Sequence, residues 1–254
     1  MTIALHYGDC LDIMKEIPDD SVDLILCDLP YGTTNCKWDT VIDLEKLWNS
    51  YNRITKDDSA IILFAQTPFD KVLGCSNLSM LKYELIWHKT QPTGHLNAKK
   101  MPLKAHENIL VFYKKLPIYN PQKTTGHTRK VVIKRNGNKP TASKIYGEQT
   151  SEPLAYDSTE RYPISVQTFS CDTQKIKFHP TQKPLDLIEW LVLTYSNENS
   201  VVLDNCMGSG TTGIVCKKIK RNFIGIEKDK TYFDIAVNRI NLEQEENTIL
   251  ELFK

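Results

Sequence analysis

The chain has 254 residues, of which 41% are hydrophobic and 25% charged, and its formal net charge is +1 at pH 7. This composition is typical of a globular protein and excludes collagen-like and low-complexity classes. No stretch approaches the ~18–20 apolar residues of a membrane span, and no signal peptide is predicted at the N-terminus. The seven cysteines form no CxxC pair. This argues against a metal site or a disulfide scaffold and favours a reducing compartment, so the expected location is the cytoplasm.

Charge is distributed unevenly along the chain. Residues 1–70 carry 13 acidic and 5 basic side chains, whereas residues 99–144 carry 12 Lys and Arg against a single acid, Glu107. A basic block of this kind is expected of a surface that contacts nucleic acid. A solvated, lysine-rich loop would carry the same charge, so charge alone leaves both interpretations open.

Short apolar, β-branched runs alternate with amphipathic segments. From the N-terminus, the predicted strands are Ile3–Tyr7, Val22–Asp28, Ala60–Ala65, Tyr83–Trp87, Ile109–Tyr113, Val201–Asp204 and Phe223–Glu227. The predicted helices are Leu44–Ile54, Leu185–Tyr195, Thr211–Ile219 and Tyr232–Glu243. This alternation, with nearly continuous apolar strands, predicts an α/β fold with a mostly parallel sheet covered on both faces.

The second predicted strand ends in the run Asp28-Leu29-Pro30-Tyr31. Sites of α/β proteins usually lie at the carboxyl edge of the sheet. Pro30 biases Leu29 toward an extended backbone, so the Leu29 carbonyl and the Asp28 carboxylate are expected to offer two acceptors to an NH2 group. Tyr31 offers a flat face on which a planar ring can stack. Such acceptors would stabilise the charge that develops when an exocyclic amine is methylated, but an ordinary Asp-x-Pro turn is the alternative.

The stretch from 115 to 178 interrupts the alternation. It is rich in Lys, Thr, Asn, Ser, Pro and Gly, and only residues 131–134 and 162–166 have the pattern of weak strands. Structureless loops of this length are uncommon in compact domains. The stretch is therefore predicted to be a small extra module or an ordered functional loop.

A glycine loop follows the strand that ends at Asp204. Its sequence is NCMGSGTTG, and a predicted helix comes next. Glycines at such a turn let the backbone approach a bound cofactor closely, and Glu227, at the end of the next strand, is suited to ribose hydroxyls. Gly213 follows Gly210 by three residues, as in a dinucleotide fingerprint, so the motif alone is compatible with NAD. However, only 44 residues follow Gly210. The rest of the sheet must come from earlier in the chain, which counts against a standard dehydrogenase.

In this order the two motifs resemble those of the β-class of amino-group DNA methyltransferases, in which Asp-Pro-Pro-Tyr precedes the glycine motif. Leu29 stands in place of the first proline, and Asn205-Cys206 in place of Pro-Phe. The similarity covers about residues 3–114 and 179–245. It implies a permuted Rossmann-like fold, with a mostly parallel, doubly wound sheet built from 1–114 and 179–254 and a target-recognition insert at 115–178.

The resemblance also implies S-adenosylmethionine as the methyl donor. The residues expected to bind it are Asp9, Cys10, Thr181, Lys183, Asp204, Met207, Gly208, Ser209, Gly210, Thr211, Thr212 and Glu227. Within this set Thr181 and Lys183, in HPTQKP, would bind the methionine carboxylate, while Glu227 would bind the ribose and Asp9 the adenine amino group. Glu107, in HENILVFYK, resembles a framework motif and is expected to be structural.

The implied activity is site-specific methylation of an exocyclic amino group in double-stranded DNA, with the target base extruded. In the insert the expected DNA contacts are Arg129, Lys130, Lys134 and Arg135. Cytosine-N4 enzymes of the family usually have Ser at the position of Asp28, so Asp favours adenine N6. Cytosine N4, an RNA or protein substrate, and a non-catalytic DNA-binding module remain as alternatives. A homodimer and an accompanying restriction endonuclease are partners that the resemblance allows.

Overall fold

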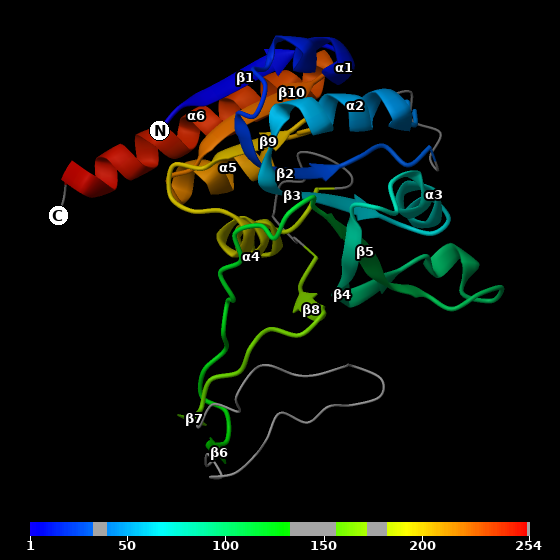
Figure 1. Ribbon diagram of the computed structural model, residues 1–254, viewed down its shortest axis with the longest axis vertical. Helices are drawn as coiled ribbons and strands as arrows, with labels where there is room; N and C mark the ends of the chain where they lie inside the picture. Colours follow the sequence, from blue (N-terminus) through cyan, green and yellow to red (C-terminus); the bar gives the residue numbers. More distant parts are fainter. Residues whose placement is uncertain (33–39, 133–155, 172–181, 253–254) are drawn as a thin grey trace. The chain divides into compact units, whose positions relative to one another are not determined.

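The computed structural model describes residues 1–32, 40–132, 156–171 and 182–252, with the backbone alone for Tyr156 and for 243–252 (Figure 1). The chain forms two compact units, one of Met1–Asn120 with Ser165–Lys254 and the other of Pro121–Ile164. Within the described ranges, none of the helices combines the length and the apolar character that a membrane span requires.

The first unit is built around an eight-stranded sheet with the order β1-β10-β9-β2-β3-β5-β4-β8. Its strands are β1 (Ile3–Tyr7), β2 (Val22–Asp28), β3 (Thr55–Ala65), β4 (Leu81–Thr93), β5 (Lys104–Phe112), β8 (Val166–Phe169), β9 (Val201–Asp204) and β10 (Asn222–Glu227). All neighbours pair in parallel except at β5, which is antiparallel to both β3 and β4. The predicted mostly parallel sheet is thereby confirmed.

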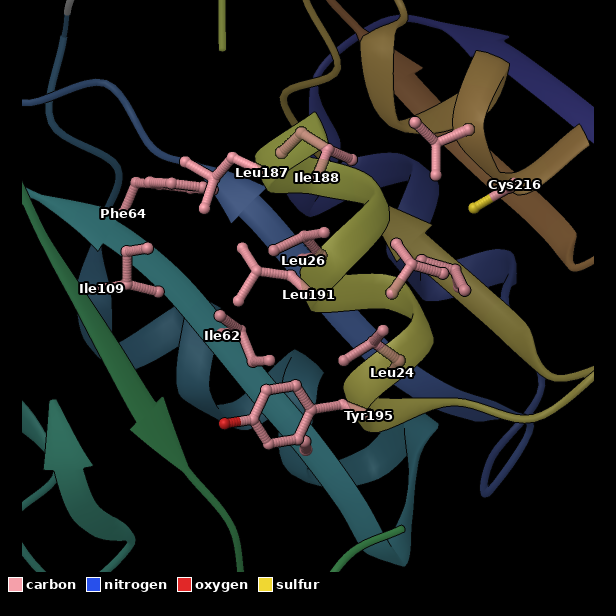
Figure 2. Packing of buried hydrophobic residues seen from close by; sticks show 14 of the residues in the cluster. Leu24, Leu26, Ile62, Phe64, Ile109, Leu187, Ile188, Leu191, Tyr195 and Cys216 are labelled. Carbon is pink, nitrogen blue, oxygen red and sulfur yellow. The ribbon is translucent and has the colours of Figure 1, made fainter. Parts of the chain in front are cut away.

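Helices cover both faces of this sheet. They are α1 (Cys10–Ile13), α2 (Leu44–Ile54), α3 (Phe69–Ser76), α4 (Leu185–Tyr195), α5 (Thr211–Lys218) and α6 (Lys230–Leu252), with short 3-10 turns η1 (Met14–Glu16) and η2 (His95–Asn97). Side chains of β2 alternate between two cores. Leu24 and Leu26 pack on the face covered by α4, α5 and α6, whereas Ile25 and Cys27 pack on the face covered by α1, α2 and α3. Figure 2 shows Leu187, Leu191 and Tyr195 of α4 packed into the first of these cores.

The local sequence explains several element boundaries. The carboxylate of Asp43 accepts a hydrogen bond from the backbone N–H of Lys46 (3.2 Å) and so caps α2. The structure confirms the predicted bounds of β1, β2, α2, α4 and β9. It adds α1 and α3, which are too short for a clear period. It also extends β4 through the polar residues 88–93, of which His88 and Thr93 pair with β5 on either side of an irregularity in the register.

The second unit contains a small antiparallel ladder of β6 (Lys130–Val132) and β7 (Tyr156–Ser158). Residues 133–155 between these strands lie outside the described residues. Strand β8, although within the predicted insert 115–178, belongs to the sheet of the first unit through its parallel pairing with β4.

Candidate active site

Four acidic residues lie at or just after the ends of four adjacent parallel strands. Asp9 follows β1, Glu227 ends β10, Asp204 ends β9 and Asp28 ends β2. Because these strands run parallel, their carboxyl ends share one edge of the sheet, as Figure 1 shows for the strands themselves. Neighbouring strands are about 4.8 Å apart, so the ends of β2 and β10 are separated by roughly 10 Å. The two predicted motifs therefore meet at a single edge.

The carboxylate of Asp28 is held from two sides. The hydroxyl of Tyr31 donates a hydrogen bond to Oδ1 (2.6 Å), and the ammonium of Lys183 lies 2.7 Å from Oδ2. A carboxylate offers about four acceptor positions, so two remain for the N–H groups of a substrate. The ring of Tyr31 stacks against Phe69, with 5.4 Å between the ring centroids and 28° between the planes. Asp28 is thus fixed in place and still able to accept.

A buried chain of alternating charge continues from Asp28 into the sheet. Lys183 lies 3.1 Å from Oε2 of Glu107, and Lys89 donates to Oε1 of Glu107 (2.5 Å). The three inner members, Lys183, Glu107 and Lys89, are all buried. Two carboxylates and two ammonium groups leave the set electrically neutral, which is the condition under which buried charges are tolerated.

The pKa values of this chain follow from burial and from the neighbouring charges. Burial raises the pKa of Asp28, and the opposing effect of Lys183 does not cancel the rise. Burial alone would raise the pKa of Glu107, but the two ammonium groups outweigh it and the pKa is lowered. Burial alone would lower the pKa of Lys183, but the two carboxylates outweigh it and the pKa is raised. Lys183 and Glu107 therefore stay charged, whereas Asp28 becomes protonated at a higher pH than an ordinary aspartate.

Asp204 and Glu227 hold the glycine loop. Asp204 accepts from the hydroxyl of Thr212 (2.7 Å) and from the backbone N–H of Cys206 (3.2 Å), and burial raises its pKa to about 7. Glu227 accepts from the backbone N–H groups of Gly208 (2.9 Å) and Asp229 (2.8 Å). Burial raises the pKa of Glu227, and these backbone hydrogen bonds oppose the rise. The loop between β9 and α5 is thereby fixed by both carboxylates.

Gly210 has a structural role besides the predicted one. Its φ is +80°, and a Cβ atom at this position would lie 2.9 Å from the Cβ of Ala236 and 3.1 Å from Cδ1 of Ile240, both on α6. A side chain here would be strained and would push against α6. Substitution of Gly210 is therefore expected to lower folding stability, and it would be a poor test of cofactor binding.

The remaining predicted cofactor residues are mostly occupied by contacts within the protein. Asp9 is exposed and caps α1 by accepting from the backbone N–H of Leu11 (2.9 Å). The hydroxyl of Ser209 accepts from the guanidinium of Arg239 (2.8 Å). The side chains of Cys10, Met207 and Thr211 are buried. Thr181 lies outside the described residues.

In the second unit the structure describes two of the four predicted DNA contacts. Both Arg129 and Lys130 are exposed. The guanidinium of Arg129 forms an ion pair with Asp157, with a first hydrogen bond of 2.6 Å from Nε and a second from Nη2. Lys134 and Arg135 lie outside the described residues.

Three contributors to the site were not predicted from the sequence: the contact of Lys183 with Asp28, the participation of Glu107 with Lys89, and the stacking of Phe69 on Tyr31. A signal for Glu107 was present. It is the single acid of the 99–144 block and it opens an apolar run, so a buried charge with a basic partner was a reasonable expectation. Lys183 and Phe69 are distant from Asp28 and Tyr31 in the sequence, and spacing carries no signal for their contacts.

Comparison with known proteins identifies the family. A family model for DNA methylases, N6_N4_Mtase, matches residues 22–238. The chain belongs to the N6/N4 DNA methylase family. This methylase is 30% identical over 257 residues to the Type II methyltransferase M1.MboII of Moraxella bovis, a match that covers 91% of this chain and 94% of that protein.

Solved structures agree with this assignment. A crystal structure of the M1.HpyAVI–SAM complex matches the methylase with a TM-score of 0.63 and 26% identity, over 94% of this chain and 100% of that one. The cytosine-N4-specific PvuII DNA methyltransferase matches with a TM-score of 0.66 over 93% of this chain and 86% of that one, but at 15% identity, which supports the fold alone. The predicted permuted Rossmann-like fold is confirmed, and the family uses S-adenosylmethionine.

Proposed function

We propose that this methylase transfers a methyl group from S-adenosylmethionine to the N6 amino group of adenine in double-stranded DNA. The observation that carries the proposal is the fixed carboxylate of Asp28 at the end of β2, on the strand adjacent to β9, whose end begins the glycine loop. By its likeness to M1.MboII, a Type II methyltransferase, we extend the proposal to a role in a Type II restriction-modification system.

The residues at the glycine loop fit the cofactor. The Glu227 carboxylate is already oriented by two backbone N–H groups, and it retains acceptor positions for ribose hydroxyls. Gly208, with φ +51°, is partly exposed and presents backbone without a side chain. Asp9, which follows β1, the strand next to β10, offers a carboxylate for the adenine amino group. When bound, S-adenosylmethionine supplies an electrophilic methyl group.

In the proposed mechanism, Asp28 and the Leu29 carbonyl accept hydrogen bonds from the target amino group. These acceptors draw the nitrogen lone pair away from the aromatic ring and stabilise the positive charge that forms on the nitrogen. Tyr31, supported by Phe69, stacks on the extruded base and holds it in line. The proton lost from the methylated nitrogen passes to a free acceptor position on Asp28, whose raised pKa makes it a better base than an ordinary aspartate.

The activity is tested by incubating the protein with duplex DNA and labelled S-adenosylmethionine, followed by nucleoside analysis of the product. N6-methyladenine is expected. N4-methylcytosine as the sole product would show that the target is cytosine N4 and not adenine N6. The same mechanism would then apply, because both targets are aromatic amines that need hydrogen-bond acceptors. Absence of any methyl transfer to DNA would overturn the proposed function.

Glu227 gives a direct prediction for cofactor binding. Glu227→Ala should lower the affinity for S-adenosylmethionine by about 10- to 100-fold, because a hydrogen bond to a charged group contributes roughly 1.5–3 kcal/mol. Glu227→Gln, which retains one acceptor oxygen, should lose less. Titration calorimetry measures the affinity, and thermal unfolding verifies that each variant is folded. Asp234→Asn, at an exposed acid of α6, is the matched control, and an unchanged affinity of Glu227→Ala would contradict the assignment.

The basic insert gives a prediction for DNA binding. We expect its main contacts to be made with phosphates, so neutralising the four predicted cations should weaken binding and flatten its salt dependence by roughly one unit of slope per lost contact. The variant carries glutamine at Arg129, Lys130, Lys134 and Arg135. The control carries glutamine at four exposed lysines of the first unit, Lys15, Lys46, Lys218 and Lys230. If both variants kept the affinity and salt slope of the wild type, the insert would be a solvated loop.

A further inference from the structure

The loop between β4 and β5 combines exposed lysines with exposed apolar side chains. Residues 94–104 contain three lysines, Lys99, Lys100 and Lys104, and no acid. Leu96 is fully exposed (101%), and Met101 is 58% exposed. In the described part of the chain none of the three lysines forms a salt bridge. These lysines belong to the basic block of the sequence but lie outside the predicted insert.

The strand register places this loop beyond the edge of the sheet that carries Asp28. Asp28 pairs with Phe64 of β3, and Phe64 pairs with Ile109 of β5. Strand β5 is antiparallel to β3, so its first residues lead toward the carboxyl ends of β2 and β3. From Ile109 back to Lys104 it spans five residues, or roughly 17 Å. The loop therefore projects beyond the edge of the sheet that carries Asp28. In Figure 1 it extends from the sheet at the right of the view.

The loop has a defined backbone. Thr93 pairs with Lys104 at its base, and the ammonium of Lys104 donates to the side-chain oxygen of Gln66 (2.8 Å). Within the loop, the backbone N–H groups of Lys100 (2.8 Å) and Met101 (3.0 Å) both donate to the carbonyl of Asn97. The tip is therefore folded, and it holds Leu96 and Met101 largely exposed to solvent.

We propose that this loop is a second DNA-contacting element, which acts where the target base leaves the duplex. Lys99 and Lys100 bind backbone phosphates, and Leu96 enters the base stack beside the extruded base. Apolar side chains flanked by cations enter base steps in this way in proteins that deform DNA. The inference rests on the proposed function and adds to it the means by which an extruded base is kept out of the helix.

The lysines are tested by the salt dependence of DNA binding. Lys99→Gln with Lys100→Gln should reduce the slope of log affinity against log salt by roughly two units, since each phosphate contact contributes about 0.9. The matched control is Lys218→Gln with Lys220→Gln, which removes the same charge at two exposed lysines that precede β10 and lie outside the basic block. An unchanged slope for the loop variant, or an equal loss in the control, would overturn the phosphate contacts.

Leu96 is tested by methylation of two duplexes that carry the sequence methylated in the product DNA. In one the target base is paired, and in the other its partner is an abasic site, so that the cost of unpairing is largely removed. Leu96→Ala should slow methylation of the paired duplex about tenfold and leave the abasic duplex nearly unaffected. Because the side chain is fully exposed, the variant is expected to fold and to bind S-adenosylmethionine normally. Equal rates for variant and wild type on the paired duplex would overturn the role of Leu96.

The two proposals fail in different ways. If the wild-type protein methylates neither duplex, the proposed function is wrong, whatever the loop variants do. If the wild type methylates both duplexes and the loop variants match it in salt slope and rate, the proposed function stands and the loop is not a DNA-contacting element.

Discussion

Replacement of Asp28 by alanine is expected to lower the turnover number by about 100-fold or more. The carboxylate is the acceptor on which the developing positive charge depends, and removal of one preorganised polar group of this kind typically costs a factor of about 100 to 1,000. The affinity for S-adenosylmethionine should change far less, because the contact strengthens mainly in the transition state. Single-turnover methylation and calorimetry measure the two quantities separately.

Three companion variants separate the charge of Asp28 from the hydroxyl and the ring of Tyr31. Asp28→Asn keeps the shape and one acceptor oxygen but removes the charge, so a large loss in this variant as well would assign the effect to charge. Tyr31→Phe removes the hydroxyl that donates to Asp28 and keeps the ring that stacks on Phe69, so its effect should be mild, whereas Tyr31→Ala should weaken capture of the base. A turnover number near that of the wild type for Asp28→Ala would contradict the mechanism.

The fold of the first unit could be predicted largely from local patterns. In the run of residues 22–28 every residue except Asp23 and the terminal Asp28 is buried, so the apolar pattern predicts both the strand and its end. The elements that were missed lack such a pattern. Helix α3 follows Pro68 and contains Gly74, and the outer part of β4 is polar.

The positions of the site residues in the chain could be predicted from the sequence, but only some of the contacts between their side chains could. A glycine loop and an Asp-x-Pro-Tyr turn are read from neighbouring residues, since each depends on local backbone geometry. The ion pairs of Lys183 depend on how α4, β2 and β5 pack, which no spacing encodes. The same holds for Gly210, whose lack of a side chain is also required by Ala236 of the distant helix α6.

Replacement of Lys183 by glutamine is expected to move the acid limb of the pH–rate profile to higher pH. The ammonium lies 2.7 Å from Asp28 and opposes the effect of burial on its pKa. Without this charge the pKa of Asp28 rises further, typically by about one to three units for a close ion pair. Turnover requires the carboxylate, so it falls as the pH drops through this pKa. The loss of activity relative to wild type should therefore be larger at acid pH than at alkaline pH.

The same substitution distinguishes the two roles of Lys183. If the ammonium serves the methionine carboxylate of the cofactor, the dissociation constant for S-adenosylmethionine should rise while the acid limb stays in place. If instead the ammonium positions Asp28 and keeps its carboxylate ionised, the acid limb should move to higher pH, with little change in the dissociation constant for S-adenosylmethionine. Folding stability is expected to fall in either case, by about 3–5 kcal/mol, since Glu107 loses one of its two buried partners.

The pH dependence of that stability loss has a definite sign. The pKa of Glu107 is lowered in the folded protein, so its ion pairs stabilise the fold above the pKa of an unfolded glutamate, near 4.3, and this contribution is lost as the pH falls through the folded value. Lys89→Gln is the matched control, because it removes the other partner of Glu107 without touching Asp28. It should lower stability in the same pH range and leave the acid limb of the rate profile close to that of the wild type. An equal displacement of the limb in both variants would show that Lys183 acts on Asp28 only through the stability of the fold.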